Sequence, residues 1–119
     1  MDVLIQNMFN ACRKNNYGYI DKNRERLTLP LLCSKNQRGN TPLYVAVANR
    51  HMDAARYLIE RGVPVNIKNE NGNTCLHKAF MNQDMDMIGF LQMKGADINA
   101  LNEFGQTPLY FASKNMLTQ

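Results

Sequence analysis

Gly39-Asn40-Thr41-Pro42-Leu43-Tyr44 is the first of three copies of one motif in this chain. The other two are Gly72-Asn73-Thr74-Cys75-Leu76-His77 and Gly105-Gln106-Thr107-Pro108-Leu109-Tyr110, and each copy begins 33 residues after the one before it. Matching residues keep the same period around the motif: Ala46, Ala79 and Ala112; Asn36, Asn69 and Asn102; Leu58 and Leu91; Gly62 and Gly95. A period of this length is typical of stacked repeats, so the chain is predicted to be an array of similar units.

Each unit is predicted to contain two short helices. Thr41 can cap the first helix with its hydroxyl, and Pro42 fits the first helical position because no N–H is needed there. An apolar stripe at helical spacing carries this helix to about Asn49, and it consists of Leu43, Ala46 and Val47. A second helix is predicted over residues 53–61, ending at Gly62 in the left-handed conformation.

The following unit repeats this plan. Its second helix is predicted over residues 84–94, and Asn71-Gly72 is predicted to form the turn of a hairpin that returns to Thr74. Two helices of this length cannot bury a core alone, so the units must stack on one another. The predicted fold is therefore all-α, a solenoid of stacked helix-turn-helix units with β-hairpin loops projecting from one edge.

The T-P-L-x-x-A pattern on a 33-residue period resembles the ankyrin repeat, most clearly from residue 36 onward. The resemblance implies one ankyrin-repeat domain over residues 1–119. It divides into a divergent N-terminal capping repeat (1–38), two repeats (39–71 and 72–104) and a partial C-terminal repeat (105–119). The capping repeat is expected to have a first helix over residues 4–14 and a weak second helix over residues 21–27 that stops before Pro30.

Some residues depart from the family pattern. Tyr44 and Tyr110 stand where the family usually has histidine, so the family's Thr–His hydrogen bond is expected between Thr74 and His77 alone. Gly89 lies inside a predicted helix, where glycine costs about 1 kcal/mol relative to alanine. Close packing of a neighbour against Gly89 is the expected reason. In the same helix, Met85 and Met87 are expected to fill gaps in the core.

Length and composition limit the class of protein. The 119 residues suit one compact domain, no apolar run is long enough to span a membrane, and the first residues lack the features of a secretory signal. Cys12, Cys33 and Cys75 are too widely spaced for a C-x-x-C motif or a disulfide framework. They are expected to be buried thiols in an intracellular protein, cytoplasmic or nuclear.

No sequence motif of a known catalytic class is present. The chain lacks G-x-S-x-G, G-x-x-x-x-G-K and H-E-x-x-H, and Cys75-x-His77 offers two of the four ligands that a zinc site needs. Asp84 and Asp86 are two positions apart on the predicted helix, so their side chains point in different directions and a role at the helix terminus is favoured. The chain is therefore predicted to be non-catalytic, with no cofactor and no metal.

Recognition of another protein is the predicted function, and the ankyrin resemblance implies that loop tips and first helices form a concave binding face. The solvent-facing positions predicted on that face are Gln37, Arg38, Asn40, Ala48, Asn49, Glu70, Asn71, Asn73, Met81, Asn82, Glu103, Phe104, Gln106, Lys114 and Asn115. Phe104 stands out because an aromatic side chain at a turn is a typical interface anchor. The alternative is that it folds back on Leu101 or Tyr110.

Other functions remain open at this point. The net charge of +4 arises within residues 1–38, where a basic run with Tyr17 and Tyr19 nearby could contact nucleic acid; its members are Lys22, Arg24, Arg26, Lys35 and Arg38. The chain could also be the substrate-recruiting or regulatory segment of a larger enzyme or signalling protein. Independently of this alternative, further repeats, self-association or a partner are expected to cover the apolar stripe of the last helix, which contains Leu109, Ala112 and Met116. Finally, the ankyrin resemblance implies that Asn99 is a candidate for asparaginyl hydroxylation.

Overall fold

A computed structural model describes residues 2–112 of the chain, and these residues fold into helices joined by loops. In chain order the helices are α1 (Asp2–Arg13), α2 (Tyr17–Lys22), α3 (Leu29–Leu32), α4 (Pro42–Ala48), α5 (Met52–Glu60), α6 (Cys75–Met81), α7 (Met85–Met93) and the 3₁₀ turn η1 (Pro108–Phe111). Residues 2–112 contain no β-strand, so the all-α class is confirmed, whereas the loops expected to be β-hairpins are turns without a strand ladder.

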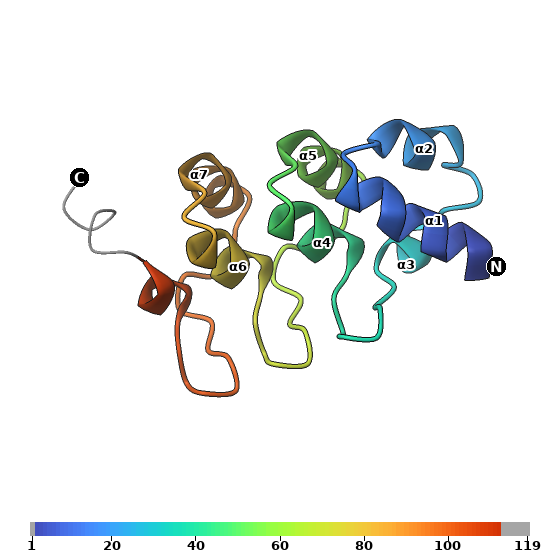
Figure 1. Cartoon of the computed structure of the whole chain (residues 1–119). Helices are drawn as coiled ribbons and strands as arrows, with labels where there is room; N and C mark the ends of the chain where they lie inside the picture. The colour runs from blue at the N-terminus through green and yellow to red at the C-terminus, as the bar shows by residue number, and fades with distance from the viewer. Residues whose placement is uncertain (1, 113–119) are drawn as a thin grey trace.

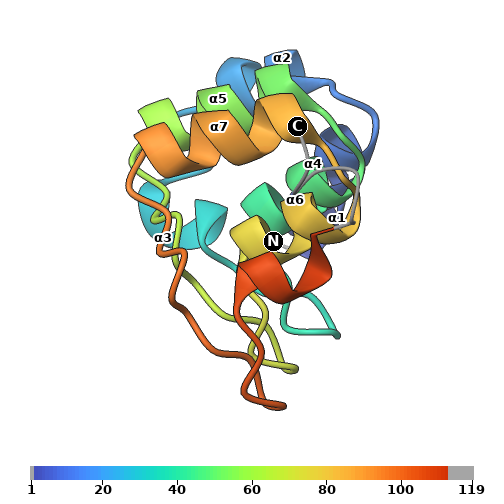
Figure 2. The same cartoon turned by 90° about the vertical axis from the view of Figure 1, so that its left-hand side faces the viewer.

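The helices lie in two rows that run along the molecule, as Figures 1 and 2 show. α1, α4, α6 and η1 contact one another in sequence and form the inner row, while α2, α5 and α7 form the outer row. Long loops project beyond the inner row, on the side away from the outer helices. The result is an elongated body with extents of 44 × 26 × 21 Å.

The apolar core lies between the two rows. Leu43 of α4 and Leu76 of α6 face it from the inner row, and Leu58 of α5 and Leu91 of α7 face it from the outer row; all four are almost completely buried. Each such side chain contributes about 2 kcal/mol of hydrophobic free energy. Because these leucines recur at the repeat period, the same contacts hold each unit against the next.

Predicted helix caps are present in both central units. The Thr41 hydroxyl accepts a hydrogen bond from the Tyr44 N–H at 3.3 Å, and the Asp84 carboxylate accepts one from the Met87 N–H at 3.3 Å. Asp84 therefore has the helix-terminus role that the sequence favoured. Gly62 adopts a φ of +102°, which confirms the predicted left-handed residue after the second helix.

The first unit differs from the prediction in its second half. The prediction of a helix over residues 21–27 is wrong, because the second helix, α2, spans Tyr17–Lys22. Where α2 ends, the Asn23 side chain donates a hydrogen bond to the Tyr19 carbonyl at 2.8 Å. The Leu27 N–H then donates to the Asn23 carbonyl at 2.8 Å, and this turn places Leu27 in the core. Pro30 does not follow a helix end but lies in the first turn of α3, which Pro tolerates.

The turn between the two helices of each unit shows how residues of the first unit align with those of the later units. A residue with positive φ lies in each such turn: Asn15 at +57°, Arg50 at +63° and Gln83 at +54°. The spacing is 33 residues between the second and third but 35 between the first and second, because the first unit carries two extra residues. Consequently Arg13 of α1 occupies the position of Ala48 in α4 and of Met81 in α6.

Two predictions about α7 need correction. Met87 is fully buried as predicted, but Met85 is 53% exposed, because residues two apart on a helix point in different directions. Gly89 is exposed, and a Cβ added there would have no atom within 4 Å outside its own helix, so close packing does not explain this glycine.

Gly89→Ala is therefore expected to stabilise the chain. Alanine is favoured over glycine by about 1 kcal/mol inside a helix, and the open space at Gly89 imposes no opposing steric cost. Urea denaturation followed by circular dichroism should show a free energy of unfolding raised by about that amount. An unchanged or lowered value would contradict the placement of Gly89 on an open helix face.

Candidate functional site

The projecting loops have the same internal construction, and each is organised by one asparagine. The Oδ1 atom of Asn36 accepts hydrogen bonds from the N–H groups of Arg38 and Asn40, both at 3.0 Å. Asn69 and Asn102 accept the equivalent bonds from the residues two and four positions further on, again at 3.0 Å. We call these loops the first tip (36–40), the second tip (69–73) and the third tip (102–106).

Neighbouring tips are also bonded to each other. The Asn69 side-chain amide donates to Asn40 Oδ1 at 2.9 Å, and the Asn102 side-chain amide donates to Asn73 Oδ1 at 3.0 Å. In parallel, the N–H of Glu103 donates to the Asn71 carbonyl at 2.9 Å. The tips therefore form a hydrogen-bonded row beside the inner helices, and this row is one wall of the surface on which the predicted site residues lie.

This bonding changes the interpretation of three predicted site residues. Asn73 is 8% exposed and accepts from Asn102, so its prediction as a solvent-facing position is wrong. Asn40 is half-buried, and its Oδ1 is similarly occupied by the Asn69 amide. Gln106 is half-buried as well, and its Oε1 accepts from the Asn102 amide at 3.0 Å. These amides hold the tips together, which repeat spacing alone does not reveal.

Asn82 likewise serves the stacking of units. Its side-chain amide lies 3.3 Å from the Val47 carbonyl and 3.1 Å from the Ala48 carbonyl, at the end of α4. Asn82 is half-buried, and its side-chain amide bonds to the preceding unit, so part of this side chain serves stacking. Met81, one residue earlier, is also half-buried, at the last position of α6.

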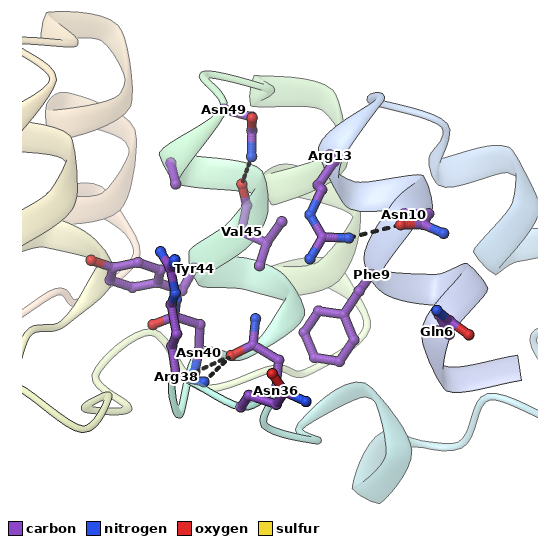
Figure 3. A pocket seen from close by; sticks show the side chains of 12 residues that line it. Gln6, Phe9, Asn10, Arg13, Asn36, Arg38, Asn40, Tyr44, Val45 and Asn49 are labelled. Carbon is purple, nitrogen blue, oxygen red and sulfur yellow. Dashed lines mark hydrogen bonds between the residues drawn. The ribbon is translucent and has the colours of Figure 1, made fainter. Parts of the chain in front are cut away.

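An open pocket of about 610 Å³ lies between α1, α4 and the first tip (Figure 3). Five of its lining residues are predicted site residues: Gln37, Arg38, Asn40, Ala48 and Asn49. In Figure 3, Arg38 and Tyr44 lie at one side of the pocket and Arg13, Asn10 and Phe9 at the other. The structure thus brings the whole predicted set of the first complete repeat into one place.

The sequence interpretation missed the α1 side of this pocket. Gln6, Phe9, Asn10 and Arg13 line it, and the Arg13 guanidinium donates to Asn10 Oδ1 at 2.7 Å. The signal was the two extra residues of the first unit. Once the register is shifted by 35 instead of 33 residues, Arg13 falls at the position of Ala48, which had been assigned to the concave face.

A smaller pocket of about 270 Å³ continues the surface toward α6. Arg38, Asn40, Tyr44 and Ala48 line both pockets, and the second tip adds Glu70 and Asn71. The two pockets therefore form one groove, which follows the inner helices from α1 to α6 and is bounded by the tips. We refer to it as the inner groove.

In the third unit, the predicted residues Glu103 and Phe104 are both exposed at the end of the third tip. Phe104 is 75% exposed, so it does not fold back on Leu101 or Tyr110, which are themselves 50% and 63% exposed. Lys114 and Asn115 lie outside the described residues, as does Met116. Leu109 is 49% exposed. That further repeats, self-association or a partner cover the apolar stripe to which it belongs stays a prediction.

The basic run of the N-terminal third does not gather into one patch. Lys22, Arg24 and Arg26 line a separate pocket together with Asp21 and Glu25, and Arg24 lies 3.3 Å from Asp21. Arg38 instead lines the inner groove. A nucleic-acid site made from the whole run is therefore disfavoured, because its charges are divided between two places and partly neutralised.

His77 is completely buried and links two units. Its Nδ1 atom accepts a hydrogen bond from the Thr74 N–H at 3.0 Å and also lies 3.0 Å from the Thr74 hydroxyl, so the predicted contact between these two residues is present. Its Nε2–H donates to the Gln106 carbonyl at 2.9 Å. Burial lowers the pKa of His77 below its usual 6.5, and the positive charge of Lys68 lowers it further, against the opposing effect of the Gln106 carbonyl. The imidazole is therefore neutral in the folded chain at neutral pH.

Acid should consequently destabilise the fold through His77. The unfolded chain takes up a proton near pH 6.5, whereas the folded chain takes it up at lower pH, so stability is lost as the pH falls through this interval. Urea midpoints should decrease between pH 7.5 and about 5.5, and His77→Gln should show a smaller decrease because glutamine does not titrate. Equal decreases in both proteins would contradict this assignment.

The three cysteines all lie within the residues that the structure describes. Burial raises the pKa of Cys12 and of Cys75 to about 12, which keeps both thiols protonated and unreactive, while Cys33 is half-buried. Among the residues that the structure describes, no group of three or more His, Cys, Asp or Glu side chains could hold a metal ion. The described helices include none with the length and hydrophobicity of a membrane span.

Comparison with known proteins identifies the repeat. A family model described as ankyrin repeats (3 copies) matches residues 8–102. A search of curated proteins finds no match to the chain.

Proposed function

Because the chain belongs to the ankyrin repeat family, whose repeats are generally protein-interaction modules, we propose that it binds a partner protein through the inner groove. Ankyrin repeat domains are typically non-catalytic, so the chain acts as an adaptor by binding and performs no reaction itself. The four segments 1–38, 39–71, 72–104 and 105–119 form one solenoid in this proposal. Its tips and inner helices contact the partner, and its outer helices support them.

The continuity of the groove is the observation that carries this proposal. One surface runs from α1 past α4 to α6, and its floor at Ala48 is shared by both pockets. The tips are held by hydrogen bonds that repeat from unit to unit, and the Ala48 carbonyl on the floor accepts one from the Asn82 side chain, so these bonds organise the surface without a partner. Preorganisation of this kind lowers the entropic cost of binding.

Blocking the groove provides the test. Ala48→Arg places a long side chain on the shared floor and should remove partners from affinity capture, with recovery measured by quantitative mass spectrometry. Phe104→Ala should reduce recovery as well, because it removes an exposed aromatic at the third tip. The matched control is Gln92→Arg, which adds the same side chain at an exposed position on α7.

Circular dichroism must show that each variant remains folded, because Ala48 is half-buried. Loss of the same partners with Ala48→Arg, together with full recovery with Gln92→Arg, supports the proposal. Equal recovery with wild type and Ala48→Arg would show that partners bind elsewhere, and loss with Gln92→Arg would place the interface on the outer helices.

Asn99 is proposed as a site of asparaginyl hydroxylation, an expectation that rests on the family resemblance. The residue is exposed in the loop after α7, and its N–H donates to the Asp97 carboxylate at 2.9 Å. Mass spectrometry of the native protein should find the peptide that spans Asn99 heavier by one oxygen atom. An entirely unmodified peptide would contradict the proposal.

A further inference from the structure

We propose that the partner enters the inner groove with an acidic, extended peptide segment, which docks against the first tip as a preceding tip would. The proposal rests on the proposed function and specifies the chemistry of the partner. Two observations support it. Two hydrogen-bond donors that bond to the preceding tip in the second and third tips have no protein acceptor in the first tip, and positive charge surrounds them.

The second and third tips show which acceptors the two donors bond to. In the second tip, the Glu70 N–H donates to the Arg38 carbonyl at 3.4 Å and the Asn69 side-chain amide donates to Asn40 Oδ1. In the third tip, the equivalent donors of Glu103 and Asn102 bond to oxygen atoms of the second tip. The second and third tips therefore each bond to one main-chain oxygen and one side-chain oxygen of the tip before them.

The first tip presents the same two donors without those acceptors. Within residues 2–112, neither the Gln37 N–H nor the side-chain amide of Asn36 donates a hydrogen bond. Within residues 2–112 the stretch of the first unit that corresponds to a tip is helical from Asp2 onward as part of α1, so it offers these donors no tip acceptors. Asn36 and Gln37 instead line the inner groove and an adjoining pocket of about 540 Å³ beside Ile5 and Gln6.

The positive charge beside the first tip favours an acidic peptide. Arg13 and Arg38 line the larger pocket, which contains no aspartate or glutamate among its lining residues, and Lys35 lines the adjoining pocket. Arginine binds carboxylates through two parallel N–H groups, which makes it well suited to this ligand. An aspartate or glutamate side chain can thus reach Asn36 and an arginine, while a peptide carbonyl meets the Gln37 N–H.

An extended peptide fits this place better than a nucleic acid does. Single strands bind by stacking their bases on exposed aromatic rings, but Phe9 is 5% exposed and Tyr44 is 9% exposed, so neither presents a ring face. The lining instead offers the exposed amide side chains of Gln6 and Gln37 and the amide donor of Asn36, groups that can pair with the N–H and C=O of a peptide backbone.

The experiment selects random dodecapeptides displayed on phage against the full chain and measures enriched peptides by fluorescence anisotropy. Enriched sequences should share at least one Asp or Glu. Arg13→Glu and Arg38→Glu should each weaken binding by about tenfold or more, the effect of losing a hydrogen bond to a charged group. The control Arg24→Glu, on a residue that lines another pocket, should change binding by less than about twofold.

Two further readouts separate a direct contact from a general charge effect. A peptide with its essential acid changed to lysine should regain affinity for the Arg13→Glu/Arg38→Glu double variant. In ¹⁵N NMR spectra, the Gln37 N–H and the Asn36 side-chain amide should shift on binding, whereas the Asn69 amide, already bonded to Asn40, should move less. Unchanged melting temperatures establish that the exposed arginine substitutions leave the fold intact.

Enrichment of neutral or basic peptides, absence of enrichment, or insensitivity to both arginine substitutions would overturn the inference. Tighter binding of oligothymidine than of the peptides, with the same arginine dependence, would assign the place to nucleic acid. A dimer in ultracentrifugation that Arg38→Glu dissociates would assign it to a second copy of the chain. If neutral peptides nevertheless lose affinity with Ala48→Arg, the proposed function stands and this inference fails.

Discussion

Replacing Gly72 with alanine is expected to lower the free energy of unfolding by about 3 kcal/mol, a large part of the stability of a small domain. Gly72 has a φ of +77°, which costs an L-residue about 1 to 2 kcal/mol. In addition, an added Cβ would lie 2.8 Å from the Glu103 nitrogen and 3.0 Å from the Asn102 Cα. Because both neighbours are backbone, the third tip would have to move.

Gly105 offers a matched control for this effect. Its φ of +71° is almost the same, but a Cβ there has no neighbour within 4 Å, so Gly105→Ala should cost about 1 kcal/mol, from the backbone conformation alone. Urea denaturation of the two variants separates conformational strain from the contact between tips. Equal losses of stability would contradict the close stacking of the second tip on the third.

His77→Ala is expected to produce a comparable loss of about 3 kcal/mol. The substitution leaves a cavity in a fully buried site and removes hydrogen bonds to the Thr74 N–H and the Gln106 carbonyl. Gln106 belongs to the next unit, so this one side chain supports both the start of α6 and the attachment of η1. Hydrogen exchange should therefore accelerate in η1 as well as in α6.

His51→Ala is the matched control. His51 is half-buried, and its Nε2 atom makes a single contact, at 2.7 Å to the Arg13 carbonyl. Loss of one such bond costs about 1 kcal/mol. A destabilisation by His77→Ala no larger than that of His51→Ala would show that the buried histidine does not couple the two units.

The central units could be predicted from sequence because their helices are determined by local signals. Thr41 and Asp84 cap helices, Gly62 ends one, and the repeat period brings leucines into register, so each residue's role follows from near neighbours. The first unit lacks these signals. Its second helix and the place of Pro30 depend on where Leu27 and Leu32 reach the core, which is a tertiary effect.

The position of the candidate site could be predicted in outline because the groove follows the repeat. Gln37, Arg38 and Ala48 line the predicted face, whereas Asn73 and Asn82 use their amides to hold adjacent units. An asparagine that faces solvent and one that bonds a neighbouring unit look alike in a sequence. The two donors of the first tip that lack a protein acceptor could not be predicted either, because they arise from the helix that stands in place of a tip in the first unit.

In the proposed complex, the inner helices and tips bind the partner while the outer helices support them. Chemical shift mapping tests this arrangement most directly: the ¹⁵N-labelled chain is titrated with the tightest enriched peptide or a captured partner. We expect the shifted amides to cluster in α1, α4, α6 and the tips, centred on Arg38 and Ala48. Shifts centred on α5 and α7, with these two residues unaffected, would contradict the claim.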